Sequence, residues 1–265
     1  MLVVMKMNKF NYKKKYGQNF LVDNNVLNKI IDNLDITSAD LVIEIGAGSG
    51  NLTKKLVTYN AKIVAYEIDL ETKKYLEKID YSNLSIFYDD ILNRNIKQDI
   101  KNYQYKNLYI IGNLPYYITT PIIEKIIKEN LNTKAIYFMV QKEVAERLTS
   151  NPKSRDYGYI TVYLKYFYDI KKLFDVSRNS FFPVPKVESS IIKLTKHNNY
   201  QVKDQKKFFS IISDAFKYKR KTLLNNLNNY DKKVIIDILQ KNNYTNLVRA
   251  EELPIEIFIE LTNAL

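Results

Sequence analysis

Half of the chain's glycines fall within one five-residue segment. The sequence has six glycines, and three of them are Gly46, Gly48 and Gly50. They follow an apolar run at residues 41–46 that is typical of a buried parallel strand, and a helical pattern follows at 51–59. Because glycine lets the backbone adopt unusual dihedral angles and approach other groups closely, this segment predicts a ligand-binding loop between a strand and a helix.

The spacing of the glycines indicates which class of ligand-binding loop this segment resembles. The segment reads EIGAGSGNLT (44–53), with Asn51 directly after its last glycine. A dinucleotide fingerprint needs G-x-G-x-x-G, and a P-loop needs Gly-Lys-Ser/Thr. The segment matches neither pattern and resembles motif I of class I methyltransferases, E/D-x-G-x-G-x-G.

Strand and helix patterns alternate on both sides of this loop. The alternation predicts an α/β, Rossmann-like domain with a mostly parallel sheet. The expected strands are residues 41–46, 61–69, 84–90, 107–117, 135–141, 160–167 and 189–194, and the expected helices are residues 23–34, 51–59, 120–130 and 142–148.

The last part of the chain has a different pattern. Apolar residues recur at helical spacing over 208–216 and again over 234–239, and Pro254 stands where the first turn of another helix would begin. We therefore expect two domains, an α/β domain at residues 1–197 and a small all-helical domain at residues 198–265.

Composition excludes several classes of protein. The chain has no cysteine, and its one histidine, His197, lies in a predicted loop. Disulfides, zinc ribbons, histidine metal sites and histidine-based triads are therefore excluded, and we expect no metal and a cytoplasmic location. No apolar run approaches the roughly 20 residues of a membrane span, so no membrane association is expected.

The chain is also strongly basic, with a formal net charge of +12. Residues 1–16 contain five lysines and no acid, and a second basic run lies at residues 217–221. Both runs favour a polyanionic partner such as nucleic acid. The alternative is a lysine-rich composition without a binding role, in which the second run is the solvated face of a helix.

Two carboxylates end the second and third predicted strands. Glu67 lies about twenty residues after the glycine loop, where an acid can accept the ribose hydroxyls of a nucleotide-like ligand. Asp90 ends the next strand, where it can accept from an adenine amine. Each acid alone also fits a solvated strand end, but together with Gly46 and Gly48 the two predict a binding site for S-adenosylmethionine.

The tetrapeptide Asn113-Leu114-Pro115-Tyr116 lies where the fourth predicted strand, at residues 107–117, runs into a turn. The side chain of Asn113 and the carbonyl of Leu114 can each accept one N–H of a conjugated amine, which would point its lone pair at a methyl donor. Pro115 stiffens the turn, and the Tyr116 ring can stack on a base. Alone this is an ordinary turn, but after the glycine loop and the two acids it predicts methyl transfer to adenine N6.

The complete set of motifs resembles the ribosomal RNA adenine dimethyltransferase family. The resemblance implies that residues 1–197 form an S-adenosylmethionine-binding catalytic domain and that residues 198–265 recognise RNA or the ribosome. The matching segments are YGQNFLVD (16–23), EIGAGSGNLT (44–53), YEID (66–69), DDIL (89–92), GNLPYYI (112–118), FFPVPKVESS (181–190), AFKYKRKTLLNNL (215–227) and RAEELP (249–254).

The resemblance also implies roles for individual residues. Asn19 and Leu21 would contact the cofactor, and Asn113 would complete that site. Phe181 would close on the target base opposite Tyr116. Catalysis would therefore combine a polar turn with two aromatic rings.

One position departs from the family pattern. Asp89 stands where the family usually has glycine before the acid. We expect Asp90 to keep its role, while the turn beside it differs.

The expected function is dimethylation of two adjacent adenines in the 3′-terminal hairpin of small-subunit ribosomal RNA, within an assembling subunit and by a monomeric enzyme with a role in subunit biogenesis. An alternative with the same chemistry is a large-subunit RNA methyltransferase that confers macrolide resistance. The Asn-Leu-Pro-Tyr turn and the segments at 181–190 and 215–227 favour the small subunit. A pure binding protein would not need an intact catalytic motif, and DNA adenine methylases usually show Asp-Pro-Pro-Tyr.

Overall fold

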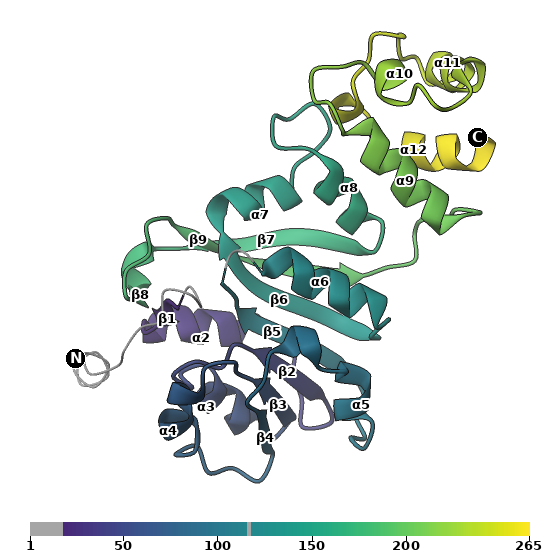
Figure 1. The fold of residues 1–265 in the computed structure, drawn as a ribbon. Coiled ribbons are helices and arrows are strands. Elements are labelled where there is room, and N and C mark those ends of the chain that lie inside the picture. Colours follow the sequence, from purple (N-terminus) through teal and green to yellow (C-terminus); the bar gives the residue numbers. More distant parts are fainter. Residues whose placement is uncertain (1–17, 116–117) are drawn as a thin grey trace. The chain divides into compact units, whose positions relative to one another are not determined.

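The computed structural model describes residues 18–115 and 118–265, and these form two compact units (Figure 1). The first unit contains the described part of Met1–Lys142 together with Lys172–Thr195, and the second contains Glu143–Lys171 and Lys196–Leu265. The expected boundary followed residue 197, whereas the contacts place it after Thr195. The second unit also takes in residues 143–171, which the sequence pattern had placed in the α/β domain.

A seven-stranded sheet is the framework of the first unit. Its order is β4-β3-β2-β5-β6-β9-β7, with β4, β3, β2, β5 and β6 parallel to one another and β9 antiparallel to β6. This confirms the expected Rossmann-like α/β fold with a mostly parallel sheet. The strands are β2 (Leu41–Ile45), β3 (Lys62–Tyr66), β4 (Leu84–Phe87), β5 (Leu108–Asn113), β6 (Thr133–Gln141), β7 (Tyr168–Val176) and β9 (Ser189–Lys196).

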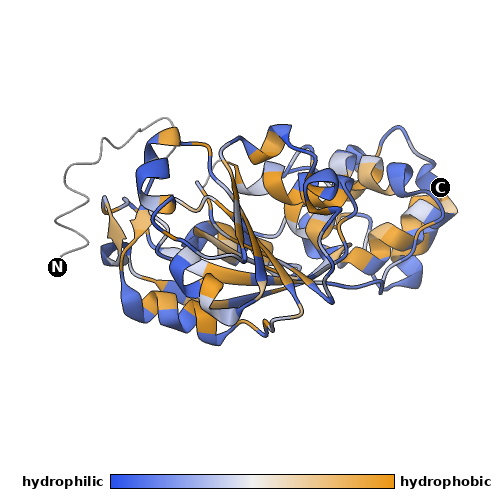
Figure 2. Ribbon diagram, turned by 90° about the horizontal axis from the view of Figure 1, so that it is seen from below, coloured by the Kyte–Doolittle hydropathy of each residue, from blue (hydrophilic) through white to orange (hydrophobic). Residues whose placement is uncertain are grey.

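The central strands are buried on both faces, which explains their nearly continuous apolar sequences (Figure 2). Val42 and Tyr109 belong to a hydrophobic cluster with residues of three helices, α2 (Asn24–Asp32), α3 (Thr53–Leu56) and α4 (Lys73–Leu76). Successive strand residues point to opposite faces, and Ile43 and Ile110 are also fully buried. The opposite face of the sheet is therefore covered as well.

Local signals account for the helices that border the sheet. Asp23 begins α2, since its side chain accepts hydrogen bonds from the backbone N–H groups of Asn25 and Val26. Leu27, Ile30 and Ile31 then place one apolar face of α2 against the core. The remaining helices of this region are α5 (Ile96–Ile100), α6 (Thr119–Lys128) and α7 (Lys142–Leu148), of which α7 starts at the end of the first unit.

The order of the strands creates a switch point at β2. The chain runs outward from β2 through β3 to β4, and then returns to the other side of β2 as β5 and continues to β6. In open α/β sheets ligands bind outside the carboxyl ends of the strands at such a point. The segment after β2 is the glycine loop, and the segment after β5 begins with Leu114.

The expected strand at residues 160–167 is wrong. This segment forms helix α8 (Tyr159–Lys165), and strand β7 begins only at Tyr168. The rings of Tyr159 and Tyr163, one helical turn apart, stack with centroids 5.8 Å from each other, and Tyr163 lies 4.9 Å from Phe209. Aromatic packing within the second unit thus overrides the strand propensity of an alternating, β-branched sequence.

The rest of the second unit is helical, as the sequence predicts. Three of its helices, α9 (Gln205–Ala215), α11 (Lys232–Lys241) and α12 (Ile255–Ala264), correspond to the expected patterns, and α12 follows Pro254. A fourth, α10 (Leu223–Asn226), was not expected. The helices share a core that includes Phe208, Leu239 and Phe258.

Residues 217–221 do not continue a helix, as they would if they formed a solvated helical face. They form an exposed turn between α9 and α10. The side chain of Asn226 ends α9 by donating to the carbonyls of Ala215 at 2.7 Å and Tyr218 at 3.1 Å. The basic run therefore lies on a loop, and a side chain of α10 binds the backbone of that loop.

Asp40 connects the segments that enter β2 and β5. Its fully buried carboxylate accepts from the backbone and side chain of Thr37, at 2.9 and 2.8 Å, and from those of Asn107, at 3.1 and 2.8 Å. Burial alone would raise the pKa of Asp40, but these hydrogen bonds outweigh it and the pKa is lowered. The ionised form is therefore the one that the fold prefers.

Asp40→Ala should lower the free energy of unfolding by about 2–3 kcal/mol at neutral pH, because it leaves buried donors unpaired. Since the folded pKa lies below the unfolded value, this stabilisation is present above about pH 4 and is lost as the pH falls through the folded pKa. Urea unfolding at neutral and acid pH measures both effects. Asp80→Ala, at an exposed acid, is the control, and a difference independent of pH would contradict a charged role for Asp40.

Candidate active site

A cavity of about 270 Å³ lies at the carboxyl edge of the central strands in the first unit. Its walls come from segments that follow β2, β3, β4 and β5, and from the residues before β1 (Phe20–Leu21). Eight residues expected at the site line it, namely Asn19, Gly46, Gly48, Glu67, Asp90, Asn113, Leu114 and Pro115. The fold thus brings together residues as far apart in the chain as Asn19 and Pro115.

The glycine loop requires its glycines. Gly46, Gly48 and Gly50 have φ angles of +77°, +57° and +76°, in the region that side chains disfavour. A Cβ atom on Gly48 would lie 2.8 Å from the ring of Phe20, and one on Gly50 would lie 2.5 Å from Cδ1 of Ile79. The loop is therefore both bent and closely packed, and these conditions explain the clustering of glycine.

Glu67 is held rigidly beside this loop. Its side chain is buried and accepts from the backbone N–H of Gly48 at 2.7 Å and from that of Asp69 at 2.8 Å, one bond to each carboxylate oxygen. Burial raises the pKa of Glu67, and the two hydrogen bonds counter part of that rise. Each oxygen keeps a second lone pair, so the carboxylate can also accept two hydroxyl groups from a ligand.

Asp90 presents a further carboxylate to the same cavity. Its Oδ1 accepts from the backbone N–H of Leu92 at 2.9 Å, which leaves Oδ2 as an acceptor. Ile68 and Ile91 line the same cavity, and Ile68 is 42% exposed in spite of its apolar side chain. Apolar walls next to a carboxylate suit a flat ring that carries an amine.

The sequence reasoning missed Ile68 and Ile91. Their positions were open to prediction, because each directly follows one of the two acids, Glu67 and Asp90. A large apolar residue next to an acid at a strand end is a signal that could have identified them.

Asn113 ends β5 at the centre of the site. Its Nδ2 donates to the backbone carbonyl of Asn19 at 3.0 Å, which orients the amide and leaves its oxygen as the acceptor end. A Cβ on Gly46 would lie only 3.5 Å from the Asn113 carbonyl, so the glycine loop and the turn that begins at Asn113 are in contact. Leu114 is buried beneath this turn, and the Pro115 carbonyl accepts from Ile118 N–H at 3.1 Å.

Leu21 lies farther inside than expected. Its side chain is buried and lines a second, smaller cavity of about 40 Å³ instead of the main one. Its carbonyl accepts from Nδ2 of Asn51 at 2.8 Å, so the residue after the last glycine fixes the segment that contains Leu21. In the sequence, Asn51 stands out only as a departure from dinucleotide spacing.

Phe181 does not line the main cavity in this structure. The residue is 2% exposed and belongs to the core of the first unit, and its backbone pairs with Leu21 where β1 meets β8 (Phe181–Phe182). The half-buried ring of Phe182 packs with Phe20, which does line the cavity. Tyr116, the other expected stacking residue, lies outside the described residues, so the aromatic pair stays a prediction.

Glu44 is a further acid that the sequence reasoning did not single out. It lines the smaller cavity together with Gly46 and Asn113, and it is 2% exposed. Burial raises the pKa of Glu44 to about 7, with a further rise from the charge of Glu67. Among the residues that the structure describes, none makes a hydrogen bond to its Oε2. Glu44 could have been recognised from the sequence, because it is the first residue of the glycine-loop segment EIGAGSG (44–50).

Residues 18–115 and 118–265 contain neither a metal-binding cluster nor a membrane-spanning helix. No group of three or more histidine, cysteine, aspartate or glutamate side chains there is arranged to hold a metal ion. In the same residues, every helix is too short or too polar to cross a membrane.

Nearly the whole chain matches a protein family. The match is to ribosomal RNA adenine dimethylase and covers residues 9–265. The chain belongs to this family. Among similar curated proteins, ribosomal RNA small subunit methyltransferase A of Aster yellows witches'-broom phytoplasma is 44% identical over 94% of each chain. The protein of the same name from Mycoplasma capricolum is also 44% identical, over 95% of this chain and 96% of its own.

Solved structures agree with this membership. A dimethyladenosine transferase from Plasmodium falciparum matches with a TM-score of 0.76 and 29% identity, over 91% of this chain and 95% of its own. The 23S rRNA methyltransferase ErmE matches with a TM-score of 0.73 over 93% of this chain and 99% of its own, but at 22% identity it supports the fold alone. The fold of this chain is therefore that of class I methyltransferases.

Gly50→Ala should lower the free energy of unfolding by about 2–5 kcal/mol, the combined cost of a positive φ and of overpacking against Ile79. Gly158→Ala is a matched control, because Gly158 has extended backbone and no atom within 4 Å of an added Cβ. This control should change stability by less than about 1 kcal/mol. Equal losses in the two variants, measured by denaturant unfolding, would contradict the packing argument.

Proposed function

We propose that this protein transfers methyl groups from S-adenosylmethionine to N6 of two adjacent adenines in the 3′-terminal hairpin of small-subunit ribosomal RNA. The observation that carries this proposal is the convergence of Glu67, Asp90 and Asn113 on one cavity at the switch point of the sheet. The names of the relatives that are 44% identical to this chain favour the small subunit as the source of the RNA.

The side chains of the two cavities fit S-adenosylmethionine group by group. Glu67 would accept the ribose hydroxyls, and Asp90 would accept from the adenine amine while Ile68 covers the ring. The buried, unpaired oxygen of Glu44 suits a cationic donor, and the ammonium group of the cofactor is one. When bound, the cofactor supplies a methyl group that its sulfonium has already activated.

The catalytic turn would act on the target amine by orientation. The amide oxygen of Asn113 and the Leu114 carbonyl would each accept one N–H of adenine N6, which turns the nitrogen lone pair out of the ring. Because Nδ2 of Asn113 is bound to the Asn19 carbonyl, the amide oxygen is already directed before the base arrives. No residue needs to remove a proton first, since proton loss can follow transfer.

The second unit offers a surface that suits RNA. Lys217, Tyr218, Lys219, Arg220 and Lys221 are all exposed on the turn after α9. The Lys221 ammonium lies 4.3 Å from the centroid of the Tyr218 ring, and this turn borders an open cavity of about 480 Å³. Cations beside an exposed ring suit phosphates and an unpaired base. We therefore propose an assembling small subunit as the partner, with this turn as one of its contacts.

Asn113→Ala should reduce turnover roughly 100-fold or more, because it removes an acceptor that acts on the reacting amine. The dissociation constant for S-adenosylmethionine should change much less, since Glu67 and Asp90 are intact. Single-turnover methyl transfer and calorimetry measure the two quantities. Asn132→Ala, at an exposed asparagine before β6, is the control. Near-normal turnover of Asn113→Ala would contradict a catalytic role and would mean that residues 113–116 form only a structural turn.

Labelled S-adenosylmethionine tests the substrate directly. The protein is incubated separately with small and large ribosomal subunits from cells that lack the modification. The expected result is dimethyladenine in small-subunit RNA, at two adjacent positions near the 3′ end, and no label in the large subunit. Label in large-subunit RNA would instead support a resistance methyltransferase, and binding without label would support a role in assembly alone.

A further inference from the structure

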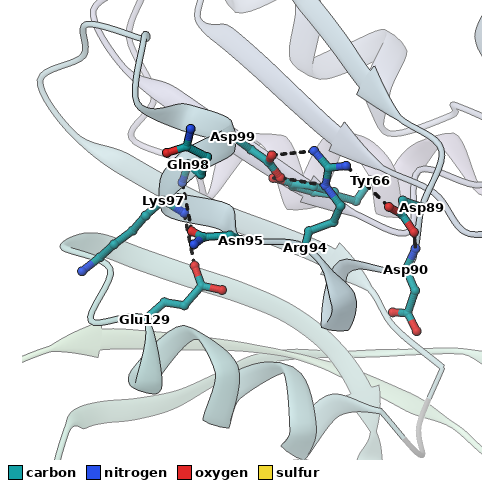
Figure 3. A network of polar contacts seen from close by, with 9 residues as sticks. All are labelled: Tyr66, Asp89, Asp90, Arg94, Asn95, Lys97, Gln98, Asp99 and Glu129. Atoms are coloured by element: carbon teal, nitrogen blue, oxygen red, sulfur yellow. Dashed lines mark hydrogen bonds and ion pairs between the residues drawn. The ribbon is translucent and has the colours of Figure 1, made fainter.

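A network of polar side chains connects the strands that precede Glu67 and Asp90 (Figure 3). Glu67 directly follows Tyr66, the last residue of β3, and Asp90 lies in the turn after β4. At the centre of the network is Arg94, which ends the short 3-10 helix η4 (Ile91–Asn93). The proposed function gives Arg94 no role.

Arg94 is fixed on the side of β3. Its Nε and Nη2 donate to the two oxygens of Asp99 at 3.1 and 2.5 Å, a bidentate geometry that lysine cannot provide. The Tyr66 hydroxyl donates to the same carboxylate at 3.0 Å. The guanidinium also lies 4.6 Å from the centroid of the Phe87 ring, which stacks on Tyr66. Because the Asp99 side chain is only 8% exposed, water competes little for these contacts.

The remaining nitrogen of Arg94 reaches the turn that contains Asp90. Nη1 lies 3.5 Å from Oδ2 of Asp89, and Oδ1 of Asp89 accepts from the backbone N–H of Asp90 at 2.8 Å. In Figure 3 the Asp89 side chain is joined to Arg94, whereas the Asp90 carboxylate points away from the network. Arg94 therefore neutralises the first of two adjacent acids and leaves the second for the cavity.

We propose that Arg94 is a positioning residue for the adenine end of the cofactor, which it orients by holding Asp89 and, through it, the backbone of Asp90. Asp89 and Asp90 line the main cavity, whereas Arg94 is not among the described residues that line it. The inference rests on the proposed function, since it assumes that the Asp90 carboxylate accepts from an adenine amine.

The Arg94–Asp89 ion pair is too exposed to contribute much to stability, which distinguishes a positioning role from a structural one. The side chains of Arg94 and Asp89 are 30% and 46% exposed, and an ion pair of this kind stabilises a fold very little. Its effect is instead on the direction of the neighbouring carboxylate, where a small rotation moves an acceptor oxygen away from its donor. Loss of the Arg94–Asp89 pair alone should therefore change ligand selectivity more than folding.

Two ligands that differ in one group give the test. One is S-adenosylhomocysteine, and the other is its analogue with hydrogen in place of the adenine amine. The unaltered protein should bind the first roughly tenfold more tightly, the effect of one hydrogen bond to a charged acceptor. Arg94→Ala should lose about this factor for S-adenosylhomocysteine while its affinity for the analogue stays within about twofold. A variant that is merely looser would weaken both ligands equally.

A second variant, Asp89→Asn, tests the same role without removing Arg94 from its contacts with Asp99. Asp89→Asn retains an acceptor for the Asp90 N–H and leaves the Arg94–Asp99 pair in place, but it removes the ion pair between positions 89 and 94. It should show the same loss of selectivity. Arg147→Ala is the matched control, because it removes an exposed arginine that pairs with Glu143 at 2.6 Å in the second unit. Thermal unfolding without ligand verifies that each variant is folded.

The outcomes distinguish this inference from the proposed function. Loss of selectivity in both variants, with the control unchanged, supports the positioning role. Selectivity retained by either folded variant overturns it and leaves the cofactor assignment intact. If the unaltered protein binds neither ligand, the proposed function fails and the inference fails with it.

Discussion

The parallel pairing of β2 with both β3 and β5 is the constraint on which the site depends. Ile45 lies beside Tyr66 in one neighbouring strand and beside Gly112 in the other. Because the three strands run in the same direction, the glycine loop, Glu67 and Asn113 emerge at one edge of the sheet. Burial on both faces fixes this register, since a shift by one residue would exchange the side chains of the two faces. Packing of the core therefore sets the geometry of the chemistry.

Hydrogen bonds then turn this adjacency into a preorganised site. The positive φ angles of the glycine loop are compatible with an N–H of Gly48 that points at the Glu67 carboxylate. The Asn19 carbonyl orients the Asn113 amide from a segment far away in the chain. Gln18 donates to Asp69 at 2.7 Å, next to the backbone group that binds Glu67. Polar groups held from several directions lose little freedom when a ligand arrives, which favours tight and directed binding.

The parts of the site that the sequence predicted are those with strict local requirements. A loop with positive φ angles needs glycine, so Gly46 and Gly48 could be recognised without any structure. Acids near strand ends and the asparagine that ends β5 were found because strand periodicity places them at the carboxyl edge. Alternating strands and helices likewise gave the α/β fold, and helical spacing gave the second unit. In all of these the signal lies within a few neighbouring residues.

Contacts between distant residues decided the rest. The segment at 160–167 became a helix because its rings pack on Phe209, although its local sequence favours a strand. Phe181 is buried because its strand pairs with the one that contains Leu21. The network around Arg94 joins three elements, and no single sequence motif predicts it. The sequence alone determined which chemical groups this protein carries and in what order. Only the tertiary structure decided which of them face a cavity, because burial depends on neighbours that the chain brings together after folding.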